Sequence, residues 1–322
     1  MPTTQIHTAF ILGAGLGTRL RPLTESLPKP LIPVFQKPLI TYAFDHLLHN
    51  GLQNFIVNTH HQPNAYTHTF PNNQYRDTPL TFRFEPILLE TAGGIANIAE
   101  LLQPDQPLLI YNGDILTDLP IQPAIDHHLA SGNTVTLILR SKGAALHIAW
   151  NPDTQKVTDI HNNLGTNPDT GFQFTGIYLV SPDFIPHLTP GKKESVIPIF
   201  LDLIKNEQSI GAVLADDNQW WDLGNRKTYL DAHATLAQNH AAFPAYGARP
   251  EQQRIHPSAQ IHPSATICPS SSVGADTVVE ADATLTQSVL WPRARATASS
   301  TLNRCILRHD AVASGLLTDA DL

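Results

Sequence analysis

Residues 11–31, ILGAGLGTRLRPLTESLPKPL, decide the fold of the first two thirds of the chain. They begin inside the short apolar run HTAFIL at residues 7–12, which predicts a buried β-strand. Gly13, Gly15 and Gly17 then occupy alternate positions, where glycine lets the backbone approach a ligand and turn its N–H groups toward anionic oxygens. Arg19 and Lys29 add positive charge suited to phosphate oxygens. A strand that ends in this loop predicts an α/β fold and a phosphate-bearing ligand.

Strand-like and helix-like runs alternate from residue 7 to about residue 240. The strand-like runs are residues 7–12, 54–59, 80–87, 107–114, 133–140, 171–180 and 210–215, with a hairpin at 147–160 that turns at 151–153. The helix-like runs are residues 38–51, opened by Pro38 and closed by Gly51, then 93–102, 195–205 and about 225–239. This order predicts a Rossmann-like, mostly parallel sheet with helices on both faces and ligands at the carboxyl ends of its strands.

The C-terminal region follows a different period. Aliphatic residues recur every six positions, at Ile255, Ile261, Ile267, Val273, Val279 and Leu285. Neither a strand nor a helix has this period, whereas the hexapeptide repeats of a parallel β-helix do. The phase is lost after Leu285, so we expect roughly three coils and a ragged end. The sequence thus predicts a catalytic domain at 1–240, a linker at 241–253 and a small hexapeptide-repeat domain at 254–322.

Two familiar glycine-rich loops do not fit residues 13–24. A P-loop needs Lys followed by Ser or Thr directly after the last glycine, and Thr18 and Arg19 stand there instead. A dinucleotide-binding loop needs its third glycine one position later, an immediate helix, and an acidic residue at the end of the second strand. That strand ends in Asn58 and Thr59, and four prolines between residues 22 and 33 prevent an immediate long helix. The loop therefore binds phosphate in another way.

Composition restricts the class of protein. The formal charge of −8 argues against a nucleic-acid partner, and no apolar stretch approaches the roughly 20 residues of a membrane span. Because the N-terminus also lacks the features of a secretion signal, we expect a cytoplasmic protein without a membrane partner. Cys268 and Cys305 form no CxxC pair and are expected to be small core residues. The adjacent histidines at 60–61 and 127–128 point to different faces, so we do not expect either pair to share a metal.

Four motifs resemble the sugar-1-phosphate nucleotidyltransferases, the NDP-sugar pyrophosphorylases. They are GAGLGTRLRPLT at residues 13–24, PKPL at 28–31, NGD at 112–114 and WDLG at 221–224. The likeness runs from Ile11 to about Leu236 in the family's order and spacing. A C-terminal left-handed β-helix, as in many mannose-1-phosphate guanylyltransferase-like enzymes, resembles the hexapeptide region. The resemblance implies an enzyme that joins a sugar 1-phosphate to an NTP and releases pyrophosphate.

The resemblance also implies the site residues. Asp114 and Asp222 would hold Mg²⁺, Arg19 would neutralise the β and γ phosphates, and Lys29 would contact the α-phosphate region. The implied nucleotide-binding residues are Leu12, Gly13, Ala14, Gly15, Gly17, Thr18, Arg19, Glu90, Ala92, Gly93 and Gly94. The implied sugar-phosphate-binding residues are Asn112, Gly113, Thr175 and Gly176. The 90–94 segment is also compatible with a simple helix start, with Thr91 as the helix cap.

One segment departs from the family pattern. Many family members have a lysine before the GIY strand that holds the sugar phosphate, but this chain has no lysine between Lys156 and Lys192. With ETAGG at residues 90–94, the core is also similar to N-acetylmuramate-1-phosphate uridylyltransferases, which usually lack the β-helix. The sugar, and the choice between UTP and GTP, therefore stay open.

Two other functions are compatible with the fold. A catalytically silent regulatory subunit would be expected to have lost one of the four charged residues Arg19, Lys29, Asp114 and Asp222, and all four remain. A bifunctional enzyme with a hexapeptide acyltransferase domain would need more coils and a histidine in a cleft, whereas His256 and His262 belong to IHPSA repeats typical of structural coils. We expect the β-helix to serve homo-oligomer assembly or allosteric control.

Overall fold

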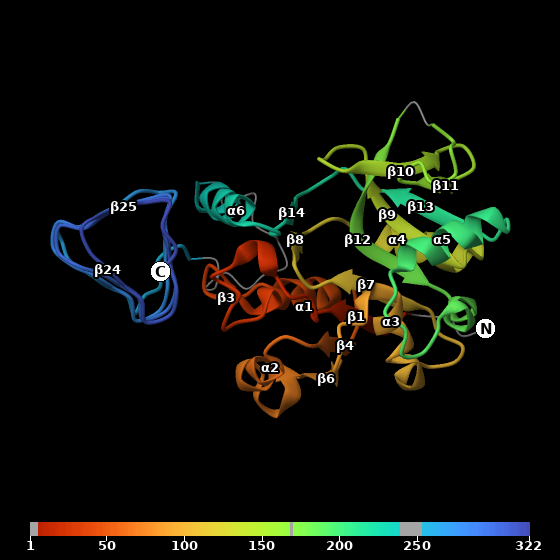
Figure 1. Ribbon diagram of the computed structural model, residues 1–322, viewed down its shortest axis with the longest axis horizontal. Helices are drawn as coiled ribbons and strands as arrows, with labels where there is room; N and C mark the ends of the chain where they lie inside the picture. Colours follow the sequence, from red (N-terminus) through yellow and green to blue (C-terminus); the bar gives the residue numbers. More distant parts are fainter. Residues whose placement is uncertain (1–5, 168–169, 239–252) are drawn as a thin grey trace. The chain divides into compact units, whose positions relative to one another are not determined.

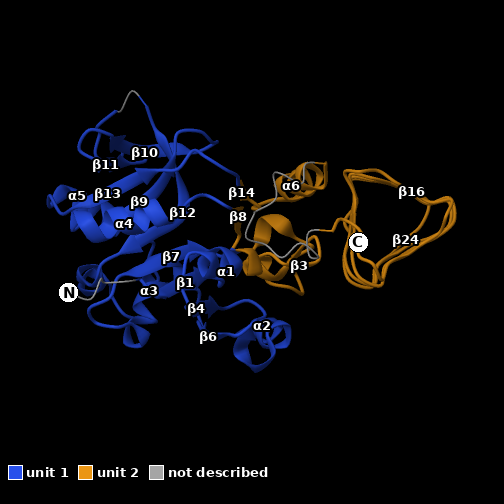
Figure 2. Ribbon diagram, turned by 180° about the vertical axis from the view of Figure 1, so that it is seen from behind, with its two compact units in different colours: residues 1–15, 43–113, 118–220 blue, residues 16–42, 114–117, 221–322 orange. Residues whose placement is uncertain are grey.

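The computed structural model describes residues 6–167, 170–238 and 253–322. The chain divides into two compact units (Figure 2). Unit 1 comprises Met1–Gly15, Ala43–Gly113 and Asp118–Trp220, and unit 2 comprises Leu16–Tyr42, Asp114–Thr117 and Trp221–Leu322. Of the predicted linker at 241–253, all but Gln253 lies outside the described residues. The predicted domain boundaries remain a prediction.

Unit 1 is built on a ten-stranded sheet (Figure 1). In spatial order its strands are β10 (Leu146–Asn151), β11 (Lys156–Ile160), β13 (Ile210–Leu214), β9 (Val135–Arg140), β12 (Phe172–Val180), β7 (Leu108–Asn112), β1 (Thr8–Leu12), β4 (Asn54–Thr59), β6 (Thr78–Phe84) and β5 (Gln74–Tyr75). The block β7-β1-β4-β6 is parallel, and so is the pair β9 and β13. Strand β12 runs antiparallel between β7 and β9.

The sheet is therefore mixed, and the expectation of a mostly parallel sheet is correct for its centre but not for the whole. Between β9 and β12, the residues that the structure describes form the predicted β10–β11 hairpin and no helix. A parallel neighbour needs a long crossover connection, usually a helix, so β12 enters in the opposite direction. The carboxyl ends of β1, β4, β7 and β9 still lie along one edge, which is the edge where the sequence places its candidate ligand site.

Helices cover both faces of the sheet. They are α1 (Ile40–His49), α2 (Pro63–Thr69), α3 (Glu90–Ala96), α4 (Gln122–Ser131) and α5 (Val196–Lys205). One core joins α3 and α5 to the strands and includes Phe10, Ile95, Ile110, Leu137, Phe200 and Leu203. Because successive strand residues alternate, Tyr111 and Thr136 point to the opposite face. There His46 of α1 lies 3.0 Å from the Tyr111 hydroxyl, and His128 of α4 lies 2.9 Å from the Thr136 hydroxyl.

Several helix boundaries differ from the sequence prediction. Helix α1 begins at Ile40, because Pro38 belongs to the short strand β3 (Lys37–Pro38). Thr91 is not a helix cap, since its hydroxyl accepts a hydrogen bond from the Val196 amide at 2.9 Å. Helices α2 and α4 have no counterpart in the prediction. Helix α4 buries few side chains, so its apolar period is weak.

The first part of unit 2 consists of short elements around one helix. They are the 3₁₀ turns η1 (Thr18–Leu20) and η2 (Lys29–Leu31), the strands β2 (Pro33–Val34), β3, β8 (Ile115–Thr117) and β14 (Trp220–Asp222), and helix α6 (Arg226–Gln238). Strand β14 pairs with β8, and its first residue, Trp220, is the last residue of unit 1. The predicted helix end at residue 239 lies outside the described residues.

The second part of unit 2 is a parallel β-helix with three faces. One face stacks β15 (Gln260–Ile261), β18 (Val278–Val279), β21 (Arg295–Ala296) and β24 (Val312–Ala313). The second stacks β16 (Thr266–Ile267), β19 (Thr284–Thr286), β22 (Thr301–Asn303) and β25 (Leu316–Thr318), and the third stacks β17 (Ser272–Val273), β20 (Val289–Leu290) and β23 (Ile306–Leu307). The predicted aliphatic column is confirmed, because Val273, Val279 and Leu285 lie in its buried core.

The number of coils is larger than the sequence suggested, since two faces are four strands deep rather than roughly three. Gln260 pairs with Val278, 18 residues later, which is three hexapeptides. Val278 then pairs with Arg295, only 17 residues later. Each later coil is thus shorter than three hexapeptides, which shifts the inward positions and hides the repeat. Cys305 is buried in this core as expected, whereas Cys268 is only half-buried.

A set of contacts joins the β-helix to α6 and to the loop between η1 and η2; we call it the β-helix joint. The Trp291 indole N–H donates to the Tyr229 hydroxyl at 2.9 Å. The Arg226 guanidinium binds Asp321 with Nε–O distances of 2.8 and 3.0 Å. Arg308 donates to the Pro22 carbonyl at 3.1 Å. A single apolar core on this side of unit 2 includes Leu20, Leu23, Leu223, Leu236, Val289, Trp291 and Ile306.

We expect Trp291→Ala to lower the free energy of unfolding by about 3–5 kcal/mol, because it removes a large buried ring and leaves a cavity. Trp291 is 2% exposed. Urea denaturation measures the change. Leu316→Ala is the matched control in the same β-helix, since Leu316 is 77% exposed and its truncation should change little. Equal effects of the two substitutions would contradict the packing described for the joint.

His233 makes the stability of the protein depend on pH. Burial lowers the pKa of His233 from 6.5 to about 4, and its Nε2 accepts a hydrogen bond from the Phe35 amide at 3.2 Å. The unfolded chain therefore takes up the proton at a higher pH than the folded protein does. Stability from the neutral ring is fully present above about pH 6.5 and is lost as pH falls toward 4.

Between pH 7 and pH 4 the free energy of unfolding should fall in the unmodified protein. We expect this fall to be smaller by about 3 kcal/mol in His233→Gln. Urea denaturation at a series of pH values measures this difference. Burial also lowers the pKa of His46 to about 3 and of His128 to about 4, so part of the pH dependence will persist in the variant. The exposed His68 provides the control substitution, His68→Gln. Identical pH profiles for all three proteins would refute the prediction.

Candidate functional site

The two aspartates of the NGD and WDLG motifs lie side by side in unit 2. Asp114 precedes β8 and Asp222 ends β14, and the pairing of these strands brings the two carboxylates together. The Leu223 amide donates to the Asp114 carbonyl at 3.4 Å, which continues this pairing. Both side chains stay accessible, with 35% of Asp114 and 45% of Asp222 exposed.

Lys29 lies between the two carboxylates. Its Nζ is 2.6 Å from Asp114 Oδ2 and 3.4 Å from Asp222 Oδ1, and its side chain is 7% exposed. The backbone turn η2, held by the stiff PKPL segment, positions this buried ammonium group. The sequence analysis expected Lys29 to contact the α-phosphate region. The structure adds that Lys29 is the counter-ion of both aspartates.

Arg19 lies beside the same pair. It is an exposed residue of η1, and a Cβ added to Gly224 would meet Arg19 Nη2 at 2.9 Å and the Asp222 carboxylate at 2.9 and 3.0 Å. Gly224 thus leaves room for both the guanidinium and the carboxylate over the WDLG turn. We call Arg19, Lys29, Asp114 and Asp222 the charged cluster. Two cations and two carboxylates at an accessible position can bind a polyanion together with a cation.

The charged cluster fits Mg²⁺. Mg²⁺ takes oxygen ligands, is often bound by one or two carboxylates, and completes its shell with water and substrate phosphates. Asp114 and Asp222 supply two such carboxylates, and the ammonium of Lys29 shows that the position between them accepts a positive charge. Among residues 6–167, 170–238 and 253–322, no three His, Cys, Asp or Glu side chains gather to form a protein-only metal site.

The glycine loop is split between the units, and its glycines serve different purposes. The Gly13 amide donates to Asn58 Oδ1 at 2.7 Å, and the Gly13 carbonyl accepts from the Tyr66 hydroxyl at 2.8 Å, so neither group is directed to a ligand. Gly15 is exposed, and a Cβ there would have nothing within 4 Å. Gly17 has a φ of 61°, the left-handed conformation that favours glycine. Leu12 is half-buried and Ala14 is buried, while Thr18 is exposed in η1.

A buried polar chain behind the loop was not among the predicted site residues. Asn58, which accepts from Gly13, donates through its Nδ2 to Glu85 Oε1 at 2.7 Å, and Glu85 Oε2 accepts from the Leu89 amide at 3.0 Å. Glu85 is fully buried. The chain connects the loop after β1 to the turn before α3. Polar residues at the ends of β4 and β6 were the sequence signal that could have indicated this hydrogen-bonded chain. A buried strand seldom ends in Asn or Glu without a partner.

The ETAGG segment forms the start of α3. Glu90 has a φ of 61°, rare for a residue with a side chain, and its carboxylate lies 3.6 Å from Lys193. Ala92 is buried and its amide donates to the Glu194 carbonyl. A Cβ on Gly93 would lie 2.2 Å from the Lys192 carbonyl, and one on Gly94 would lie 3.2 Å from both Asn58 and Glu85. Packing within the protein therefore requires glycine at position 93 and makes a larger residue tight at position 94.

The predicted sugar-phosphate residues also lie together, in unit 1. Asn112 ends β7, and a Cβ on Gly176 would lie 2.5 Å from its Nδ2. Gly176 has a φ of 83° at an irregularity of β12, which keeps this contact open. Thr175 is buried, and its hydroxyl donates to the Ile138 carbonyl at 2.8 Å. The Gly113 amide donates to the Leu12 carbonyl at 3.1 Å.

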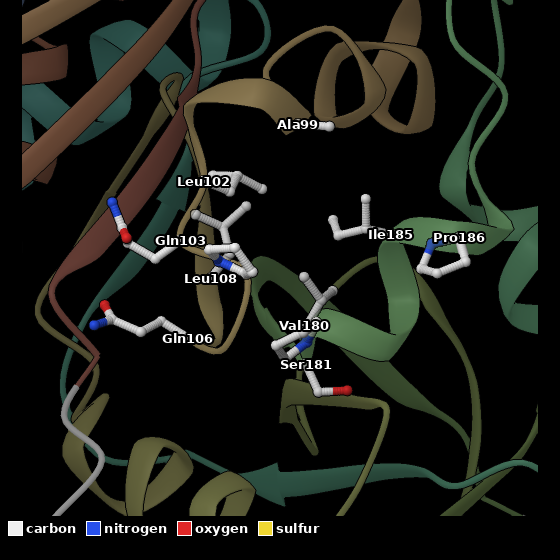
Figure 3. A pocket seen from close by; sticks show the side chains of 11 residues that line it. Ala99, Leu102, Gln103, Gln106, Leu108, Val180, Ser181, Ile185 and Pro186 are labelled. Carbon is white, nitrogen blue, oxygen red and sulfur yellow. The ribbon is translucent and has the colours of Figure 1, made fainter.

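A pocket of about 260 Å³ in unit 1 contains none of the predicted site residues (Figure 3). Leu108, the first residue of β7, and Val180, the last residue of the antiparallel β12, line it with Leu102 and Ile185. It therefore lies at the edge of the sheet opposite to Asn112 and Gly176.

In the described part of the chain no helix is both long and apolar enough to cross a membrane.

Comparison with known proteins assigns the chain to a family. The sequence profile of the nucleotidyl transferase family matches residues 8–239. This match covers well over half of the chain, and the protein belongs to the nucleotidyl transferase family. The prediction of the family from the glycine loop, NGD and WDLG is confirmed.

Curated relatives carry several substrate names. The chain is 27% identical over 261 residues to a mannose-1-phosphate guanylyltransferase of Mycobacterium tuberculosis, covering 80% of this chain and 72% of that protein. It is 28% identical over 233 residues to an N-acetylmuramate alpha-1-phosphate uridylyltransferase of Neisseria meningitidis serogroup B, covering 70% of this chain and 96% of that protein. A UTP–glucose-1-phosphate uridylyltransferase of Synechocystis is 27% identical over 241 residues, and the match spans only 62% of its length.

One solved structure shares the fold. HddC from Yersinia pseudotuberculosis superimposes with a TM-score of 0.58 at 21% identity, covering 70% of this chain and 98% of that chain. The similarity confirms the Rossmann-like α/β core.

Proposed function

We propose that this protein transfers a nucleotidyl group from an NTP, UTP or GTP, to a sugar 1-phosphate with Mg²⁺, giving an NDP-sugar and pyrophosphate. Membership of the nucleotidyl transferase family and the names of the relatives support the reaction class. The observation that carries the proposal is the charged cluster, in which Lys29 contacts both Asp114 and Asp222. Such an arrangement serves the joining of two highly charged anions.

The acceptor needs no general base. The second pKa of a phosphate monoester is about 6, so a sugar 1-phosphate is largely a dianion at neutral pH and can attack directly. The barrier lies in bringing a dianion to the α-phosphate of a polyanion, which positioning and positive charge relieve. Mg²⁺, when bound to Asp114 and Asp222, would supply positive charge at the α-phosphate.

The residues of the charged cluster have separate tasks in this proposal. Lys29 neutralises the two carboxylates and contacts the α-phosphate region. Arg19, exposed beside Asp222, binds the β and γ phosphates and stabilises the leaving pyrophosphate. Gly15 and Thr18 lie in the exposed part of the loop, where the triphosphate would bind. Asn112 and Gly176 would contact the sugar side.

A matrix of NTPs against sugar 1-phosphates of the muramate, mannose, glucose and heptose types tests the proposal, with pyrophosphate release in Mg²⁺ as the readout. At least one pair should release pyrophosphate, and removal of Mg²⁺ with a chelator should abolish the release. Binding of substrates without release by any pair would overturn the proposal in favour of a silent regulatory subunit. Consumption of acetyl-CoA with an amino-sugar nucleotide would indicate the acyltransferase alternative. The two histidines of the IHPSA repeats make local contacts: Nδ1 of His256 and Nδ1 of His262 each lie 2.8 Å from a serine of their own turn.

Three further predictions accompany this proposal and rest on the sequence and the resemblance. The β-helix winds left-handed, the protein works in the cytoplasm, and the β-helix contributes to a homo-oligomer.

A further inference from the structure

Arg140 is a buried cation whose Nε has no hydrogen-bond partner in the described part of the chain. It is the last residue of β9, at the same edge of the sheet as Asn112, and it is 9% exposed. Its Nε atom is inaccessible to solvent and has no partner among the residues that the structure describes. A guanidinium has five N–H donors and cannot lose its charge in a protein, so its burial without acceptors is unfavourable.

The carboxylate whose charge acts on Arg140 hydrogen-bonds to another residue. The Asp216 carboxylate, whose charge acts on Arg140, accepts from the Ser141 amide at 2.8 Å and from the Ser141 hydroxyl at 2.6 Å. Gln173 is the cross-strand neighbour of Arg140, and its Oε1 is also buried without a partner in the described part of the chain. Burial lowers the pKa of Arg140, although the charge of Asp216 acts to raise it.

Trp220 holds the guanidinium near the predicted sugar-phosphate residues. The Arg140 Cζ atom lies 5.7 Å from the centre of the Trp220 ring. The Trp220 indole N–H donates to the Thr175 carbonyl at 2.9 Å, and Thr175 precedes Gly176, which lies against Asn112. Contact with an aromatic face uses no N–H group of the arginine, so it leaves the Nη donors to an anion.

An arginine in this state suits a phosphate group, because its fork of N–H donors matches two phosphate oxygens. The sequence lacks a lysine between Lys156 and Lys192, where the resemblance leads one to expect the cation for the sugar phosphate. A dianionic acceptor still needs a positive charge on its side of the site.

We propose that Arg140, held in place by Trp220, binds the phosphate group of the sugar 1-phosphate at the sheet edge that also carries Asn112 and Gly176. This inference rests on the proposed function, since it names the residue that recognises the acceptor.

Steady-state kinetics of Arg140→Gln and Arg140→Lys, with the best pair from the substrate matrix, test the inference. We expect the KM for the sugar 1-phosphate to rise on the order of 10- to 100-fold in Arg140→Gln, with the KM for the NTP unchanged. Arg140→Lys keeps the charge but loses the fork, so its KM should lie between those of Arg140→Gln and the unmodified enzyme. Lys142→Gln, an exposed cation two residues away, is the matched control and should change neither KM. Should Arg140→Gln not fold, Arg140→Lys still separates the two KM values.

Calorimetric titration of glucose 1-phosphate and mannose 1-phosphate, with free glucose and mannose as neutral controls, separates this inference from the proposed function. Turnover with an unchanged KM for the sugar 1-phosphate in folded Arg140 variants would overturn the inference and keep the function. Binding of a sugar 1-phosphate that is lost in Arg140→Gln, without turnover of any pair, would keep the inference and overturn the function. Equal rises in both KM values would show that Arg140 is structural and would also overturn the inference.

Discussion

Asp114→Asn should reduce pyrophosphate release on the order of 10³-fold while the protein remains folded. The substitution removes one of two carboxylates available to Mg²⁺ but keeps an oxygen that can accept from Lys29, whose Nζ lies 2.6 Å from Asp114 Oδ2. Because Asp114 is 35% exposed, its charge is partly screened by solvent, and we expect the melting temperature to change by no more than about 4 °C. Initial rates over a range of Mg²⁺ concentrations, together with a thermal melt, measure both effects.

The matched control is Asp126→Asn. Asp126 is an exposed aspartate of α4 that accepts a hydrogen bond from Gln122 and does not belong to the charged cluster. It should retain full activity. Near-normal turnover by Asp114→Asn would remove Asp114 from the role of metal ligand, whatever the control shows.

Arg19→Ala should lower turnover by a similar factor for a different reason. A cation that neutralises a leaving pyrophosphate can contribute on the order of 10³-fold to the rate of phosphoryl transfer. Arg19 is exposed in η1, so truncating it should not disturb the fold. Arg19→Lys should recover only part of the rate, because a point charge replaces the fork of donors. Single-turnover measurement of pyrophosphate release isolates this step from product dissociation.

Arg21→Ala provides the comparison for Arg19. Arg21 is an exposed arginine of the same loop, two residues further on, and it has no assigned contact with the triphosphate. Its loss should leave turnover within a factor of about two, the change expected of a peripheral charge under screening salt. If the two arginine variants lost activity equally, the effect would belong to the net charge of the loop rather than to Arg19.

The features that the sequence predicted are those set by local pattern. The apolar run before Gly13, the strand before Asn112 and the capped helix after Ser195 each depend on neighbouring residues, and the structure forms all three. The six-residue period likewise predicted the β-helix, because each face of a coil repeats locally.

The features that the sequence did not predict depend on pairing between distant residues. Lys29 and Asp222 are 193 residues apart in the chain, and Asp222 lies beside Asp114 because β8 and β14 pair. The Gly13 amide was assigned to a ligand, but Asn58 at the end of another strand takes it. From the sequence, Arg140 was only the last residue of an ordinary strand. The burial of its Nε without a hydrogen-bond partner among the described residues results from packing. A local pattern carries no information about such contacts.

The β-helix joint has a consequence for shortened versions of the chain. Val289, Trp291 and Ile306 complete the apolar core that also contains Leu20 and Leu23 from the loop of Arg19 and Lys29. A protein truncated before residue 254 would lose this part of the core, so the loop would be left without its apolar cover. We therefore expect the repeats and this loop to unfold together, so that inactivity after truncation would report misfolding rather than a catalytic role of the repeats.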